Sequence, residues 1–178
     1  MAFRILGTRV DWLAEGERPP TGDVLVIPAN DHLWMLSGPG LDLRKAHGKE
    51  IEIEAVRQGP LEAGRVAVTP GALCGYRWLH HAVVMGKDLA WVEGAGRAAA
   101  RESIGIAKRA SAAAVVVYPF YRGVHGRHEP PAREMLAGLL DGLEEVSGIK
   151  TISVLYQGVD EKALLHETFL QLLSASSG

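Results

Sequence analysis

The sequence contains a single cysteine, Cys74, and no apolar stretch long enough to cross a membrane. One cysteine cannot form an internal disulfide or supply a thiolate cluster for zinc. No basic residues lie beside Cys74 to activate it, so we expect a small core residue rather than a nucleophile. The longest apolar run, residues 112–120, is far shorter than the roughly 20 residues that span a bilayer, which predicts a protein that does not enter membranes.

An excess of charge of one sign is also lacking. The chain has 19 basic and 21 acidic residues and a formal net charge of −2, so it has no overall positive field that would attract nucleic acid. The N-terminus has no apolar segment followed by a cleavage site, and a cytoplasmic location is therefore expected.

The length of 178 residues corresponds to about one domain, on a prior of roughly 150 residues each. The sequence shows no internal repeat, change of composition or linker. We expect residues 1–173 to form a single domain and residues 174–178 a short flexible tail.

Apolar segments rich in β-branched residues alternate with segments of helical periodicity. Such alternation predicts an α/β fold with helices on both faces of the sheet. The predicted strands are 3–12, with a turn or bulge at Gly7, and 24–27, 66–69, 79–85, 113–118 and 149–156. The predicted helices are 41–56, 97–110, 132–146 and 160–173.

Three of the predicted strands end in segments that could form a ligand site. One continues through Asn30 into a loop with Gly38 and Gly40, another leads into the loop 122–126, and the last ends at Tyr156. Ligands of open α/β sheets bind beyond the carboxyl ends of the strands, and loops near helix starts offer free N–H groups to phosphates. One such loop alone is more typical of an ordinary turn, but together they indicate a nucleotide pocket.

Two further motifs have contexts that argue against the function they suggest. The segment 94–99 matches the glycine pattern G-x-G-x-x-A of dinucleotide-binding folds, but no clear strand precedes it, so a turn into a helix is expected. His80 and His81 are adjacent on a strand and must point to opposite faces, while His125 and His128 lie in a loop, so no metal site is expected.

Trp34, in the first glycine-containing loop, is a candidate for a mobile lid.

The order of several segments along the chain resembles the macrodomain family, whose members bind ADP-ribose or its derivatives. Residues 23–30, Asp-Val-Leu-Val-Ile-Pro-Ala-Asn, are similar to the family signature D-A-I-V-N-A-A-N, and residues 118–126 resemble F-P-x-I-x-T-G-x-Y-G. Further matches are Gly48, residues 59–71, the strand 79–83 and the closing strand 152–156. The resemblance covers nearly the whole chain, and residues 45–73 are most similar to the macro-histone member. It implies a three-layer α/β/α sandwich with a mixed, mostly parallel sheet.

The resemblance also implies a set of ligand contacts. Asp11 would accept a hydrogen bond from the adenine amino group, Asn30 would face the distal ribose, and Tyr156 would pack on adenine. The diphosphate would lie between two loops whose backbone it contacts. These loops contain Gly38 and Gly40 in the first, and Gly123, Val124, His125 and Gly126 in the second. The ligand would be an ADP-ribose-type small molecule or an ADP-ribosylated macromolecule, with no other cofactor and no metal.

Departures from the family pattern concern the residues associated with hydrolysis. Ile27 replaces the first asparagine of the signature, and Gly40 stands where many hydrolytic members have an aspartate. The resemblance therefore implies a binding protein with little or no hydrolysis. Two alternatives remain open. One is a degenerate macrodomain that serves as a protein-interaction or structural module without a nucleotide site, and the other is an ADP-ribosyl hydrolase or O-acetyl-ADP-ribose deacetylase that uses Asp42 or His125.

Overall fold

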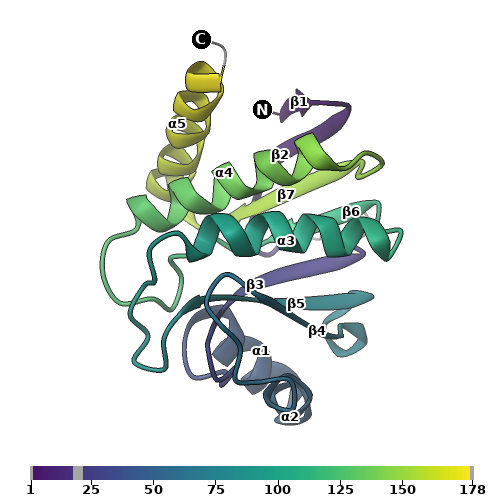
Figure 1. Cartoon of the computed structure of the whole chain (residues 1–178), viewed down its shortest axis with the longest axis vertical. Coiled ribbons are helices and arrows are strands. Elements are labelled where there is room, and N and C mark those ends of the chain that lie inside the picture. The colour runs from purple at the N-terminus through teal and green to yellow at the C-terminus, as the bar shows by residue number, and fades with distance from the viewer. Residues whose placement is uncertain (1, 18–21, 177–178) are drawn as a thin grey trace.

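A seven-stranded mixed sheet, with strand order β1-β2-β7-β6-β3-β5-β4, forms the centre of the protein (Figure 1). The computed structural model describes residues 2–17 and 22–176. The strands are β1 (Ala2–Ile5), β2 (Thr8–Ala14), β3 (Val24–Asn30), β4 (Val66–Pro70), β5 (Trp78–Met85), β6 (Ala114–Val117) and β7 (Thr151–Tyr156).

Five of these strands, β2, β7, β6, β3 and β5, are parallel, whereas β1 and β4 run antiparallel to their neighbours at the two sides of the sheet. The last residues of the parallel strands therefore meet along one edge, which we call the carboxyl edge. They are Ala14, Asn30, Met85, Val117 and Tyr156. The opposite edge, where these strands begin, is the amino edge.

Helices cover both faces of the sheet, as predicted. They are α1 (Gly38–His47), α2 (Glu50–Val56), α3 (Ala95–Arg109), α4 (Glu129–Glu145) and α5 (Gly158–Ser176), with a short 3-10 helix, η1 (Ala72–Cys74), before β5. Successive residues of β3 point to opposite faces: Val26 packs under α3 and α4, while Ile27 packs with Met35 and Ile51 on the side of α1 and α2. Figure 1 shows α3 and α4 side by side across one face, with α1 and α2 on the other.

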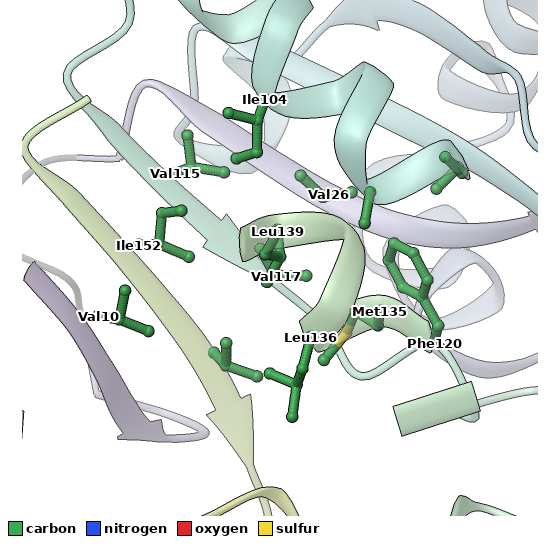
Figure 2. Close-up of a cluster of buried hydrophobic side chains, with 14 of the residues drawn as sticks. Val10, Val26, Ile104, Val115, Val117, Phe120, Met135, Leu136, Leu139 and Ile152 are labelled. Carbon is green, nitrogen blue, oxygen red and sulfur yellow. The ribbon is translucent and has the colours of Figure 1, made fainter. Parts of the chain in front are cut away.

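The larger part of the core lies between the sheet and the pair α3 and α4 (Figure 2). Ile104, Met135 and Leu136 are fully buried, and burying an apolar side chain of this size contributes about 1.5–3 kcal/mol. Gly142 lets the two helices approach closely, because an added Cβ there would lie 2.7 Å from Cβ of Ile104. The loops at both edges of the sheet therefore start from strands that this tightly packed core fixes in place.

The structure corrects two of the predicted helical boundaries. The predicted helix 41–56 is two helices, because Gly48 adopts a left-handed φ of +94° and ends α1. The tail expected from residue 174 is helical as far as Ser176, where α5 ends, and residues 177–178 lie outside the described residues. None of the described helices is long and apolar enough to cross a bilayer.

Candidate functional site

Two loops that follow β3 and β6 contact each other at the carboxyl edge. We call residues 31–40, which include the first turn of α1, the first loop, and residues 118–128 the second loop. Ser37 Oγ donates a hydrogen bond to the carbonyl oxygen of Gly123 at 2.8 Å. An added Cβ on Gly38 would lie 2.7 Å from the carbonyl oxygen of Arg122, and one on Gly123 would lie 2.9 Å from the nitrogen of Gly38. Since both glycines also have positive φ, of +53° and +83°, this close contact requires glycine at both positions.

The glycines of both loops leave backbone donors unused. The N–H groups of Gly123 and Gly126 donate to no acceptor among the described residues. Gly38 and Gly40 lie in the first turn of α1, where N–H groups have no partner within the helix. Donors of this kind at a helix N-terminus favour an anion, so the two loops together can bind a phosphate group through the main chain.

Asn30 lies beneath the first loop and is 2% exposed. Its Nδ2 donates to the carbonyl oxygen of Trp34 at 2.7 Å, and its Oδ1 accepts from the N–H groups of His32 and Trp34. Both ends of the amide therefore hold the first loop in place, and the second N–H of Nδ2, which donates to no acceptor among the described residues, is available to a ribose hydroxyl. A cavity of about 10 Å³ beside Asn30 and His81 has room for roughly one water molecule.

The rest of the first loop carries exposed apolar side chains. Trp34 is 41% exposed and Leu36 49% exposed, and the Trp34 ring lies 4.5 Å from the ring of His32. Met35 points inward, and its N–H donates to Glu52 on α2 at 2.7 Å. Trp34 therefore has the position expected of a lid, and its movement stays a prediction.

The second loop is held by Arg122, whose side chain is 13% exposed. Its Nε and Nη2 donate to Glu161 on α5 at 3.2 and 2.7 Å, and its Nη1 donates to Glu15, which follows β2, at 2.6 Å. The guanidinium carbon also lies 5.6 Å from the centre of the Tyr118 ring. One arginine thus joins three segments of the carboxyl edge, and sequence analysis did not identify this role.

Burial and ion pairing have opposite effects on the pKa values of Arg122 and Glu161. Burial alone would lower the pKa of Arg122, but its hydrogen bonds to Glu161 and Glu15 outweigh burial and raise it. Burial would raise the pKa of Glu161, but Arg122 and the N–H of Gln157 lower it. Burial, with smaller contributions from Glu15 and other neighbours, raises the pKa of Tyr118 to about 12. Arg122 and Glu161 are therefore both charged at neutral pH, and the guanidinium group, bound on two sides by Glu161 and Glu15, has no charge free for an anion.

Asp11 is not brought to the carboxyl edge. It lies within β2 opposite Ser153 and accepts a hydrogen bond from Nε of Arg9 at 2.9 Å. The prediction placed the end of this strand at Trp12, but the strand continues to Ala14, about 10 Å beyond Asp11 at roughly 3.3 Å per residue. The carboxylates at the exit of β2 are those of Glu15 and Glu17, and correct placement of the strand end would have identified them.

The remaining predicted contacts lie at the carboxyl edge but not in one cluster. Tyr156 is half-buried, and Nζ of Lys162 lies 5.2 Å from the centre of its ring. Val124 is half-buried against the core, while His125 is exposed and its N–H donates to Leu89 at 2.9 Å. Asp42 is exposed on α1 and is one of the charges that raise the pKa of Tyr118. No hydrogen bond or ion pair connects Asp42 with His125 in the described part of the chain.

His80 and His81 each have a hydroxyl partner, and the glycines of residues 94–99 have a carboxylate partner. His80 contacts Ser103 at 2.7 Å and His81 contacts Thr69 at 2.9 Å, on opposite faces of β5. Residues 2–17 and 22–176 contain no group of three or more potential metal ligands. The N–H groups of Gly94 and Gly96, which a dinucleotide phosphate would need, donate to the Glu134 carboxylate at 2.9 and 3.0 Å.

Comparison with known sequences gives little information. No family model matches the chain. An uncharacterized protein of Aeropyrum pernix is 33% identical over 81 residues, which are 45% of this chain and 43% of that protein. The chain thus matches less than half the length of that relative.

Comparison with solved structures is more informative. The Oceanobacillus iheyensis macrodomain with ADP is similar with a TM-score of 0.81 and 19% identity, over 98% of this chain and 97% of the other. The Trypanosoma brucei macrodomain in complex with ADP-ribose gives a TM-score of 0.68 and 18% identity, over 86% and 64%. The macrodomain of Thermus aquaticus DarG gives 0.65 and 14%, over 83% and 97%. Together with the strand order and the two contacting glycine loops, these similarities show that the chain has the macrodomain fold.

Proposed function

We propose that the protein binds ADP-ribose or a related ADP-ribosyl ligand at the carboxyl edge, with little or no hydrolysis. The observation that carries the proposal is the set of unused N–H groups at Gly38, Gly40, Gly123 and Gly126, in two loops that contact each other. A diphosphate is bound mainly by hydrogen-bond donors, and backbone N–H groups at a helix N-terminus supply such donors. Macrodomains of known structure that share this fold were solved with ADP and with ADP-ribose.

The surroundings of the loops suit the two ends of such a ligand. Tyr156 offers a half-buried aromatic ring at the end of β7 for the adenine base. Glu17 is an exposed carboxylate at the exit of β2 with no ion-pair partner among the described residues, whereas Glu15 is bound to Arg122. Asp11 has one buried carboxylate oxygen, Oδ1, without a hydrogen-bond partner among the described residues, so it remains the proposed contact to the adenine amino group, with Glu17 as the second candidate. The distal ribose would lie beside the first loop, near Trp34.

Weak hydrolysis follows from the side chains near that ribose. Cleavage needs a group that holds and polarises a water or a hydroxyl within hydrogen-bond reach. Ile27 is fully buried, Gly40 has no side chain, and the amide oxygen of Asn30 accepts its hydrogen bonds within its own loop. Asp42 and His125 remain the candidates for the alternative in which the protein is an enzyme.

Titration calorimetry with ADP-ribose, on the parent and two glycine variants, tests the proposal. Gly126→Val adds a side chain that meets open space at a φ of +118°, so it should disturb ligand contacts in the second loop and weaken binding at least tenfold. Gly105→Ala is the control, because Gly105 lies within α3, outside both loops, and its Cβ would meet only the end of the Arg109 side chain at 3.4 Å. A folded parent that binds no ADP-ribose at millimolar concentration would favour the degenerate module.

The same preparations decide the question of hydrolysis. We expect the parent to release no ADP-ribose from a mono-ADP-ribosylated carrier protein over hours. Release by the parent that is lost in Asp42→Ala or His125→Ala would identify the protein as a hydrolase.

A further inference from the structure

The amino edge carries a second cluster of features, on the hairpin formed by β1 and β2. A hollow of about 460 Å³ is lined there by the cationic side chains of Arg4, Arg9 and Lys150, together with Leu6. The ammonium group of Lys108 lies beside it, because an added Cβ on Gly148 would come within 2.7 Å of Nζ of Lys108. Four positive charges thus surround a hollow whose volume is in the range of small-molecule sites, roughly 300–1,000 Å³.

The strand register forces two of these charges together. Arg4 on β1 lies directly opposite Arg9 on β2, so their side chains are on the same face of the hairpin. Like charges directly opposite each other destabilise a strand pair. Asp11 pairs with Arg9 at 2.9 Å, but no carboxylate among residues 2–17 and 22–176 lies within ion-pair distance of Arg4, Lys108 or Lys150. The positive charge of the hollow is therefore only partly neutralised.

Leu6, at the turn of the same hairpin, is unfavourable in two further ways. Its φ of +47° is in the left-handed region, which a large side chain rarely adopts, and its side chain is 69% exposed. Glycine or asparagine would form this turn without strain and without exposing an apolar surface. Backbone strain, an exposed apolar side chain and unneutralised charge therefore occur together around one hollow. Unfavourable local features of this kind concentrate at functional sites.

We propose that this hollow binds a small organic phosphate. The guanidinium groups of Arg4 and Arg9 match the geometry of phosphate oxygens, and Lys150 adds a third positive charge beside them. Leu6 contacts the carbon skeleton of the ligand. Apart from these cations the chain is net negative, which favours a compact ligand over an extended nucleic acid. The site lies at the edge opposite the two glycine loops, so it is independent of the proposed function.

Amide chemical shifts measured during titration with ribose 5-phosphate test the proposal directly. The Gly126→Val variant serves as the background, which separates this site from the carboxyl edge. We expect saturable shifts at Leu6, Gly7 and Gly148. Inorganic pyrophosphate should shift the same amides but bind more weakly, because it lacks a carbon skeleton for Leu6 to contact.

Variants that each remove one charge, made in the Gly126→Val background, test which side chains bind the phosphate. Arg4→Gln and Lys150→Gln should each weaken binding about tenfold, as expected for loss of a charge-assisted hydrogen bond. Asp11→Asn should tighten binding, because it releases Arg9 from its competing carboxylate. Arg57→Gln is the control, since Arg57 is an exposed arginine just after α2 that pairs with Glu54, and it should have no effect.

Several outcomes would overturn the assignment. Absence of shifts at the hairpin, or shifts that persist in both Arg4→Gln and Lys150→Gln, would mean that these charges only protect the edge of the sheet. Tighter binding of a 12-nucleotide single strand than of ribose 5-phosphate, with a steep dependence on salt, would identify a nucleic acid surface instead.

Discussion

At the carboxyl edge of the sheet the backbone has free hydrogen-bond donors, whereas at the amino edge the side chains have free charges. Near the glycine loops, Arg122 is neutralised by Glu15 and Glu161. At the amino edge, the N–H groups of Ala113 and Ala114 instead donate to the Asp23 carboxylate at 2.7 and 3.0 Å. One edge can therefore bind an anion through its main chain, and the other through its side chains.

This difference determines what sequence analysis can detect. A main-chain site needs only a few glycines, which are also common in ordinary turns. A side-chain site needs specific residue types, but its cations are far apart in the chain: the register of β1, β2 and β7 brings Arg4 near Lys150, and Lys108 comes from α3.

Acidification should destabilise the protein and loosen the carboxyl edge first. Burial lowers the pKa of His80 to about 4 and that of His81, with a contribution from His80, to about 3, from an ordinary value of 6.5. The unfolded chain therefore binds more protons below pH 6.5, so stability is complete above that pH and is lost as the pH falls. Each histidine contributes about 1.4 kcal/mol per pH unit between pH 6 and pH 4, so the loss from pH 7 to pH 5 is up to about 4 kcal/mol.

Urea unfolding at both pH values measures this loss. His81→Gln should reduce the dependence on pH by about half. Because His81 lines the cavity beneath the first loop, amide exchange at pH 5 should accelerate there before it accelerates in the β1–β2 hairpin. Equal urea midpoints at pH 7 and pH 5 would contradict the prediction.

Removal of Arg122 should have the next largest effect. Arg122→Ala leaves Glu15 and Glu161 without their shared partner in a partly buried site, which we expect to lower the free energy of unfolding by about 2–3 kcal/mol. Adding Glu161→Gln to this variant should restore part of the loss, because it removes one of the two uncompensated charges. Thermal unfolding of the single and double variants measures the coupling. Full stability in Arg122→Ala would show that the carboxyl edge does not depend on this ion pair.

Much of the fold could be predicted, because long apolar runs and helical periodicity in the sequence indicate directly which residues are buried. The strands containing Val26, Val117 and Ile152 are the clearest cases, and all three residues are fully buried. Element ends were less predictable, because they depend on local conformation. The break at Gly48 and the extension of β2 to Ala14 are two examples.

The candidate site was predictable only in part, for a similar reason. Gly38 and Gly123 were identified because they lie in glycine-containing loops after predicted strands, at positions that match the diphosphate loops of the family. The role of Arg122 was not identified, because Glu15 and Glu161 are 107 and 39 residues away from it in the chain. The assignment of Asp11 to adenine stays a prediction, and the extension of β2 by two residues places Asp11 three residues before the strand end.

Removal of Arg4 should have the smallest effect, and of opposite sign to removal of Arg122. Arg4→Gln takes away a positive charge directly opposite Arg9, so we expect the free energy of unfolding to rise by about 0.2–0.5 kcal/mol at low salt. The gain should disappear in 1 M salt, where the Debye length is about 3 Å and exposed charges no longer repel each other. Urea unfolding at both salt concentrations, with Arg57→Gln as the control for an exposed arginine that has an acidic partner, separates this repulsion from a general effect of charge. A loss of stability in Arg4→Gln, comparable to that in Arg122→Ala, would mean that both edges use arginine as a structural anchor, and the contrast between them would not hold.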